Sequence, residues 1–451
     1  MRIPVIPPSA QAPFPRDNAS LEEVRQFIRK RSRPEVQALA DEANEKYLHW
    51  DKLRFYPMPE GIDPQVVWSV INEKRSTQFI TLPFKSVKDV TFRYWVPPQH
   101  QEWISTIDQQ AGGVLLSESA SSISDDHQTT LFNSLMEEAI ASSIIEGAVV
   151  TREIAKEMLR TQRAPRDTAE QMILNNYQTM LHIRDWKSEK MTPALLCEMQ
   201  KLLTTNTLEK TDASGRFRRA DEKITVFDES TNEVIHTPPP AEDLPKQMKE
   251  LCDFANSKTS PYIHPVIKAI VLHFIMGYLH PFYDGNGRTA RALFYWYMLK
   301  SGFWLFEYLP ISRLILSSRI SYYRSYLYTE TDHNDVTYFN HYQLSVIVNA
   351  IHDFHAYRQT KEKERQQAQE LLERFPDLNL RQRLLLQHAI HHPQTVYTVR
   401  GHEGKYRIAY NTAKADLYQL ESMGLLTGGK KTPGRETQFR PIKNLVKKLK
   451  G

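Results

Sequence analysis

The sequence is poor in cysteine, in long apolar runs and in net charge, and each shortage excludes a class of protein. Only two of its 451 residues are cysteine, which excludes a disulfide scaffold and a zinc site built from several thiolates. Cys197 and Cys252 lie among apolar residues, and we expect both to be buried small side chains. The longest mostly apolar stretch, residues 266–279, is shorter than a membrane span requires, so we expect no membrane partner.

We also expect no secretory signal. The sequence begins MRIPVIPPSAQAPFPR, with proline where a signal peptide needs an apolar run. Together with the scarcity of cysteine, this favours a cytoplasmic location. Apolar residues make up 41% of the chain and charged residues 25%, which is ordinary for globular proteins, and the length allows about two to four domains.

The net charge of +5 is too small to indicate a nucleic-acid-binding protein, but the charge is unevenly distributed. Residues 381–451 contain 14 lysines and arginines against 4 acidic residues, whereas the remainder contains 44 against 49. This asymmetry indicates a basic C-terminal module attached to a mildly acidic body.

Composition and periodicity divide the chain into four parts. A charged helical pattern covers residues 20–48, and aromatic and β-branched residues mixed with proline over residues 51–100 predict short strands and loops. We interpret residues 111–126 as a loop. The domain prediction is an N-terminal region of helix and short strands at 1–110, a mainly helical core at 111–356, a polar linker helix at 357–376 and a C-terminal module at 377–451.

The most informative segment begins with an almost wholly apolar helix that follows Pro265 and that we expect to be buried. His280 precedes Pro281, which disfavours helical geometry at His280 and places it at a helix-to-loop junction. A histidine near its ordinary pKa can accept a proton from a hydroxyl group, which by itself is a poor nucleophile near neutral pH.

The loop after His280 combines residue types that suit a nucleotide. Gly285, Asn286 and Gly287 tolerate unusual backbone angles, and their N–H groups can form an anion-binding nest at the start of the next helix. Two further features are one carboxylate, enough for a magnesium ion that also binds phosphates and water, and two arginines on one helical face. These are Asp284, Arg288 and Arg291.

The spacing of these residues, His280-Pro-Phe-x-Asp284-Gly-Asn-Gly-Arg288-x-x-Arg291, resembles the signature of the Fic family (filamentation induced by cAMP) at every fixed position. The resemblance extends over about half of the chain. It implies a helical core that transfers AMP from ATP and Mg²⁺ to a protein hydroxyl. His280 would be the general base and Asp284 the Mg²⁺ ligand. The glycines with Asn286 would form the phosphate nest, and the two arginines would bind the β- and γ-phosphates.

Two β-prone runs, residues 224–227 and 234–237, flank a polar turn and predict a hairpin. This hairpin resembles the flap of the family, and its alternative is an ordinary surface hairpin. As a flap, Ile224, Thr225 and Val226 would pair with an extended segment of the target protein. The segment between Arg218 and the first strand is longer than is usual in the family, which leaves the register against the target open.

An inhibitory element is expected upstream of the core. Residues 132–149 have helical periodicity, and Ser142-x-x-x-Glu146-Gly147 resembles the inhibitory helix of Fic proteins, here at about 128–147. Gly147 would cap the helix, and Glu146 would pair with Arg291 and occupy the γ-phosphate position. The alternative is a plain capped helix.

The C-terminal module has the order helix, helix, helix, hairpin and resembles the winged helix-turn-helix that often follows Fic cores. The start of its recognition helix and its wing would carry the contacts to DNA. These residues are Asn411, Thr412 and Lys414, then Lys430, Lys431 and Arg435. Protein contact or homodimerisation is an equally open use of such a module.

The sequence therefore predicts an autoinhibited protein adenylyltransferase that acts on a partner protein with an acceptor Ser, Thr or Tyr. No Walker-type loop, kinase lysine motif or HExxH string competes with this interpretation. Two alternatives remain: an enzyme that removes AMP or does both, and a non-enzymatic, DNA-bound regulator that only senses nucleotide. The intact His280 argues against the latter, because a sensor needs the nest but not a base.

Overall fold

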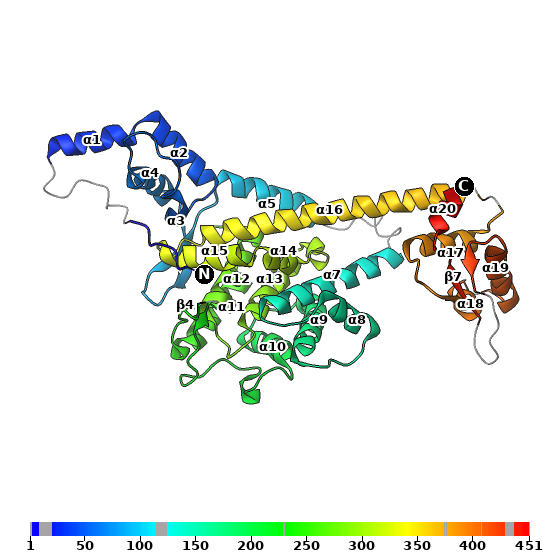
Figure 1. Ribbon diagram of the computed structural model, residues 1–451. Coiled ribbons are helices and arrows are strands. Elements are labelled where there is room, and N and C mark those ends of the chain that lie inside the picture. The colour runs from blue at the N-terminus through cyan, green and yellow to red at the C-terminus, as the bar shows by residue number, and fades with distance from the viewer. Residues whose placement is uncertain are drawn as a thin grey trace. The chain divides into compact units, whose positions relative to one another are not determined.

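A pair of buried helices, α12 (Pro265–Leu279) and α13 (Asn286–Lys300), lies at the centre of the first of two structural units (Figure 1). Every side chain of α12 from Val266 to Leu279 is buried, which confirms the expected central helix. A helix that is apolar all round can be stable only when protein surrounds it.

In this computed structural model, the placement of residues 2–8, 20–113, 124–228, 231–373, 375, 377–406, 408–428 and 437–450 is described. They form two units, residues 1–352 and 353–451. The predicted loop at 111–126 lies mostly outside the described residues. The fold is mainly α, as expected, and none of the described helices has the length and apolarity that a bilayer crossing requires.

Other helices surround the central pair in the first unit. They are α7 (Ser124–Ile145), α8 (Arg152–Thr161), α9 (Thr168–Trp186), α10 (Pro193–Thr204), α11 (Leu244–Asn256), α14 (Ile311–Ser317) and α15 (Arg319–Thr331), with the 3₁₀ turns η1 (Thr211–Ala213), η2 (Ala241–Asp243) and η3 (Trp304–Glu307). Both α9 and α10 pack on α13, and α7 packs on α9 and α14. Cys252 is buried as expected, whereas Cys197 is partly exposed.

The N-terminal part of this unit is more helical than its sequence indicates. Its elements are α1 (Leu21–Arg31), α2 (Pro34–Glu45), α3 (Trp50–Leu53), α4 (Pro64–Ser76), the antiparallel strands β1 (Ile80–Lys85) and β2 (Thr91–Tyr94), and α5 (Pro98–Ala111). The expectation of strands and loops over 51–100 is therefore wrong for α4. This helix contains β-branched residues, but Asp63 caps it and its apolar face is buried, so tertiary packing outweighs local preference.

A buried arginine joins this N-terminal part to the first turn of α16 (Thr337–Glu373). Arg75, only 1% exposed, donates to Asn44 Oδ1 (2.8 Å), Leu48 O (3.0 Å) and Tyr338 Oη (2.7 Å). Its guanidinium also stacks 4.0 Å from the Tyr47 ring centroid. A charge removed from water in this way is tolerated only because its donors find acceptors.

The predicted linker at 357–376 is not a separate helix. It is the continuation of α16, which runs without a break from Thr337 to Glu373, and the two units divide between residues 352 and 353. No glycine or proline interrupts this stretch before Pro376, so no residue stops the helix at the expected boundary.

The second unit has its own apolar core around Leu386, Leu417 and Phe439. Its elements after α16 are α17 (Leu380–His391), β5 (Tyr397–Thr398), α18 (Val399–Tyr406), α19 (Tyr410–Ser422), β6 (Leu426–Thr427), β7 (Gln438–Pro441) and α20 (Leu445–Lys450), with the strands in the order β5-β7-β6. The winged-helix interpretation of this unit stays a prediction.

Candidate active site

His280 lies at the carboxyl end of α12 in a left-handed conformation, with φ of 46°. Its Nδ1 lies 3.1 Å from Gly277 O. Because a carbonyl can only accept, Nδ1 carries the proton, and the lone pair of the neutral ring lies on Nε2. Burial lowers the pKa of His280 to about 4. This value is below the near-neutral pKa that we expected, and it keeps the ring neutral and able to accept a proton.

The loop that follows is braced by Asn286. Phe282 N–H donates to Asn286 Oδ1 (2.8 Å), and Asn286 Nδ2 donates to Phe282 O (2.9 Å). Of the three predicted nest residues, only Gly285 has an unusual backbone, with φ of 82°. Asn286 and Gly287 are the first residues of α13, so any anion site here is the N-terminus of this long helix rather than an extended nest.

Asp284 lies on the solvent side of the loop. Its side chain is 49% exposed, and Oδ2 is 3.3 Å from Arg288 Nη2. Among the described residues, no three histidine, cysteine or acidic side chains cluster as metal ligands. One half-exposed carboxylate suits a magnesium ion that takes its other ligands from phosphates and water. The residues therefore fit an ion that arrives with a nucleotide.

The two arginines of the motif contact different neighbours. Arg288 is buried and donates to Leu203 O at the end of α10 (2.9 Å). Arg291 instead faces α7. Their sequence spacing predicted a shared face, but α10 and α7 draw the guanidiniums apart, so only Arg291 contacts the expected inhibitory residues. A phosphate-binding role for Arg288 stays a prediction.

The end of α7 brings Ser142 and Glu146 to Arg291. Arg291 Nε donates to Ser142 Oγ (2.8 Å) and Nη2 to Ser142 O (2.9 Å), while Nη1 is 3.0 Å from Glu146 Oε1. A side chain on Gly287 would collide with the Glu146 carboxylate. A negative charge thus lies at the N-terminus of α13, where the helix dipole favours it. Gly147 follows with φ of 94°, in the conformation expected of a C-terminal cap.

The predicted hairpin is present but shorter than expected. β3 (Val226–Phe227) pairs with β4 (Val234–His236), and Val226 lies opposite His236. Ile224 and Thr225 precede the strand and are partly exposed. The ladder between the two strands consists of two residue pairs, Val226 with His236 and Phe227 with Val234, and the register shifts between them.

Arg218 joins the hairpin to the loop at His280. Its Nε donates to His280 O (2.9 Å), its Nη2 donates to Pro239 O, and its backbone N–H donates to Pro281 O (2.8 Å). The side chain is buried, and burial lowers the pKa of the guanidinium. Arg218 therefore holds the backbone around His280 in place.

The candidate DNA contacts divide between described and undescribed residues. Asn411 and Thr412 are exposed in the first turn of α19, and Lys414 is partly exposed there, with Nζ 5.8 Å from the Tyr418 ring centroid. Lys430, Lys431 and Arg435 lie outside the described residues.

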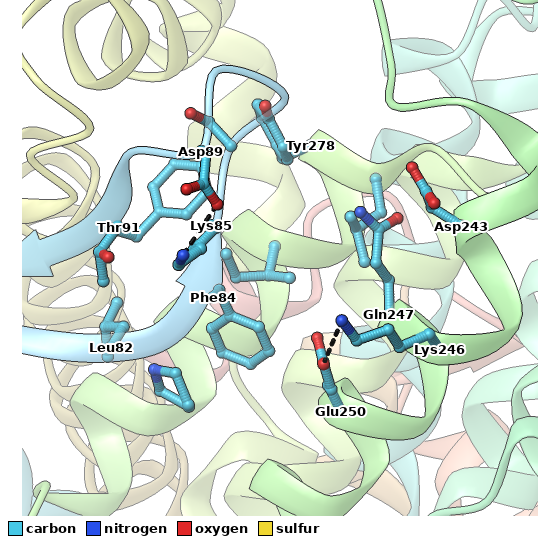
Figure 2. A pocket seen from close by; sticks show the side chains of 15 residues that line it. Leu82, Phe84, Lys85, Asp89, Thr91, Asp243, Lys246, Gln247, Glu250 and Tyr278 are labelled. Atoms are coloured by element: carbon cyan, nitrogen blue, oxygen red, sulfur yellow. Dashed lines mark hydrogen bonds and ion pairs between the residues drawn. The ribbon is translucent and has the colours of Figure 1, made fainter.

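A separate pocket of about 510 Å³ opens between the β1–β2 hairpin and helices α11 and α12 (Figure 2). Four of its five charged side chains pair with one another, Lys85 with Asp89 at 2.8 Å and Lys246 with Glu250 at 3.9 Å. None of its lining residues belongs to the predicted site. This pocket therefore does not coincide with the predicted site.

Comparison with known proteins places this geometry in a family. Residues 190–298 match the model of the Fic/DOC family, and this range contains the whole motif from His280 to Arg291. The chain contains a Fic domain at residues 190–298.

Two curated relatives of this Fic domain carry the name protein adenylyltransferase. The chain is 39% identical over 101 residues to Protein adenylyltransferase Fic of Nematostella vectensis, which is 22% of either chain. It is 37% identical over 89 residues to Protein adenylyltransferase fic-1 of Caenorhabditis elegans, which is 20% of this chain and 16% of that one. The chain thus aligns with only about a fifth of the length of these relatives.

Solved structures extend the likeness of fold beyond the Fic domain itself. A Fic family protein from Desulfovibrio desulfuricans G20 superposes with a TM-score of 0.54 at 18% identity, covering 78% of this chain and 98% of that one. A fragment of Fic-1 from C. elegans superposes with a TM-score of 0.50 at 15% identity, covering 76% and 95%.

The sequence predicted no role for three residues around the Fic motif. They are Arg218, Glu138 on α7 and His236 on β4. Glu138 is buried and accepts from Ser312 N–H (2.9 Å) and Tyr295 Oη (2.7 Å), while His236 contacts α12 and α15. The partners of all three are distant in the sequence, and only the GRFR string around Arg218 offered a local signal.

Proposed function

We propose that this Fic domain protein transfers AMP from ATP to a hydroxyl group of a partner protein and that Glu146 inhibits the reaction. The names of its curated relatives support this activity, and the stretch that aligns with the family contains His280, Asp284 and Arg291. The inhibited state is supported by the position of the Glu146 carboxylate at the start of α13.

In the proposed reaction, the acceptor hydroxyl oxygen attacks the α-phosphorus of ATP. A bond from this oxygen to phosphorus forms, the bond from phosphorus to the bridging oxygen breaks, and pyrophosphate leaves. His280 takes the hydroxyl proton on Nε2, the atom that carries the lone pair of the neutral ring. The bonds from Arg218 and Gly277 hold this ring and its backbone in place.

Negative charge that develops on the phosphates would lie near the N-terminus of α13 and near the Arg291 guanidinium. The first N–H groups of a helix have no partners within it, and the guanidinium adds a full positive charge. Asp284 would hold the Mg²⁺ ion, which when bound offsets charge on the polyphosphate.

Glu146 would inhibit by competition for the same anion site. Its carboxylate already pairs with Arg291, which is only 3% exposed, and lies against Gly287. A terminal phosphate therefore has to displace this carboxylate before it can reach the guanidinium. ATP could still bind, but with its phosphates out of line for the attack.

The partner would dock on the hairpin. In the described part of the chain, β3 and β4 pair only with each other, so each has a free edge, and Phe227 is 48% exposed. An extended segment of the partner can add as a strand along such an edge, which would bring its hydroxyl to His280. The predicted docking residues Ile224, Thr225 and Val226 lie at the start of this hairpin.

The test is transfer of label from α-³²P-ATP to the full chain itself and to lysate proteins. We expect the Glu146→Gly variant to transfer at least about tenfold more label than the parent, because one charge-assisted ion pair no longer competes. The matched control Glu189→Gly removes an exposed carboxylate elsewhere and should change nothing.

Adding His280→Ala to Glu146→Gly should abolish the labelling. Equal labelling by the parent and Glu146→Gly would refute the inhibitory role. Labelling that survives His280→Ala would refute the base. If Glu146→Gly only loses the ability to strip AMP from a labelled protein, removal of AMP is the activity instead.

A further inference from the structure

His236, the last residue of β4, uses both of its ring nitrogens on hydrogen-bond acceptors. Its Nδ1 is 2.9 Å from Glu330 Oε2 on α15, and its Nε2 is 2.8 Å from Tyr278 O on α12. An ionised carboxylate and a carbonyl can only accept, so the ring satisfies both contacts when both nitrogens carry a proton. This geometry describes an imidazolium cation with a side chain that is 9% exposed.

The surroundings of His236 contain charges of both signs. Burial opposes the cation, but the hydrogen bond and charge of Glu330 outweigh it, and the pKa of His236 lies above its ordinary value. Arg218 opposes the charge from the adjacent loop, and the Tyr278 ring lies beside it with centroids 5.0 Å apart. The ion pair with Glu330 therefore decides the state of the ring.

The contacts of this cation lie next to the proposed base. Tyr278 is in the last turn of α12, two residues before His280, where unpaired carbonyls carry partial negative charge that attracts cations. On the hairpin, His236 lies opposite Val226, one of the predicted docking residues. A single side chain thus joins the hairpin to the end of the helix that carries His280.

We propose that His236 is a positioning residue, whose cation holds the docking hairpin in register with His280 during AMP transfer. This inference rests on the proposed function. The cation also lies close enough to help lower the pKa of His280, after burial as the larger cause. Loss of the charge should therefore act on the reaction in two ways, through the position of the acceptor and through the titration of the base.

The pH dependence gives the sign of each effect. A histidine with a raised pKa keeps its full contribution below its ordinary pKa and loses it as the pH rises through the raised pKa. Transfer by the Glu146→Gly variant should therefore decline on the alkaline side as His236 loses its proton, and on the acid side as His280 gains one. Glu330→Gln should move the alkaline decline to lower pH, because it removes the charge that stabilises the cation.

The experiment measures self-labelling with α-³²P-ATP against pH in full-length Glu146→Gly, alone and combined with His236→Gln, Glu330→Gln or the control His352→Gln. His352 is an exposed histidine of α16. At neutral pH we expect His236→Gln to lower kcat by about tenfold or more, since a charge-assisted hydrogen bond is lost, with the KM for ATP nearly unchanged. His236→Gln should also remove the decline of AMP transfer at alkaline pH and move the decline at acid pH to a higher pH. The control His352→Gln should change neither kcat nor the pH profile.

An independent measurement uses ¹⁵N-histidine NMR of the unmodified chain, with the His236 signal assigned from His236→Gln. We expect both ring nitrogens to be protonated at neutral pH. A ring with one proton there, or an active parent whose pH profile is unaltered by His236→Gln, would overturn the positioning role alone. A Glu146→Gly parent that transfers no label would instead refute the proposed function itself.

Discussion

Glu138 offers a way to release the proposed inhibition without touching the nucleotide site. It lies on α7 with Ser142, and Glu146 directly follows the last residue of this helix; the spacing of four residues places all three on one face. Its buried carboxyl accepts from Ser312 N–H at the start of α14, from Ser312 Oγ and from Tyr295 Oη. Burial raises the pKa of this carboxyl. These hydrogen bonds fix α7 in place at a point about two helical turns before Glu146.

The Glu138→Ala variant leaves two buried donors, Ser312 N–H and Ser312 Oγ, without this acceptor, whereas Tyr295 Oη can still donate to Leu309 O at 2.7 Å. Each buried unsatisfied donor costs about 1–3 kcal/mol, and we expect a loss of about 3 kcal/mol in the free energy of unfolding. Part of this loss favours displacement of α7. If half of it does, the population with Glu146 withdrawn rises by about tenfold, since 1.4 kcal/mol corresponds to one factor of ten.

The assay is self-labelling with α-³²P-ATP alongside thermal unfolding. Glu138→Gln is the matched control, because its amide keeps an oxygen for Ser312 N–H and a nitrogen that can donate to Ser312 Oγ, so both labelling and stability should stay near the parent values. In a Glu146→Gly background, Glu138→Ala should add no activity, because the inhibitory carboxylate is already absent.

Two results would refute this reasoning. One is a Glu138→Ala variant that is destabilised but no more active than the parent, which would separate the packing of α7 from the inhibition. The other is equal activation by Glu138→Ala with and without Glu146, which would show that the effect does not pass through the carboxylate.

Two further predictions concern buried arginines. Arg75→Leu should lower the free energy of unfolding by about 3–5 kcal/mol, because it removes a buried charge whose partners then lose their donors. Urea unfolding measures this loss. The control Lys74→Leu, which breaks an exposed ion pair, should lower the free energy of unfolding by less than about 1 kcal/mol. Arg218→Lys in the Glu146→Gly background should lower kcat for AMP transfer by about tenfold, because a lysine lacks the fixed fork with which a guanidinium donates to two separate carbonyls. The control Arg219→Lys, at the exposed neighbouring residue, should leave kcat unchanged. Equal rates in the two variants would show that the contact with His280 O is not needed.

Local sequence patterns predicted the structure correctly where neighbouring residues decide it. The apolar run after Pro265 becomes α12, and the glycine at 285 supplies the left-handed turn before α13. The same approach failed at α4, where β-branched residues indicated strands. There the burial of Val67, Trp68 and Ile71 against other helices outweighs the local preference.

The candidate site shows the same division. The twelve residues from His280 to Arg291 run from the end of α12 through a short loop into α13. The sequence therefore places the proposed base, the carboxylate and the arginines together. It also placed Arg288 and Arg291 on one helical face. In the structure their guanidiniums contact different helices, because α10 and α7 each offer acceptors to one of them, and their phosphate-binding roles stay predictions.

The sequence by itself therefore determined the ends of α12 and α13 around the motif, the left-handed glycine at 285 and the order of the chemical groups, since each depends on residues a few positions apart. The pair of Glu146 with Arg291 was expected only from the resemblance to the Fic family, and the tertiary structure alone decided which other charges meet. Glu146 lies 145 residues before Arg291, and His236 lies 94 residues before Glu330. Such pairs form because helix packing brings distant segments together, and no local preference of either residue encodes the contact.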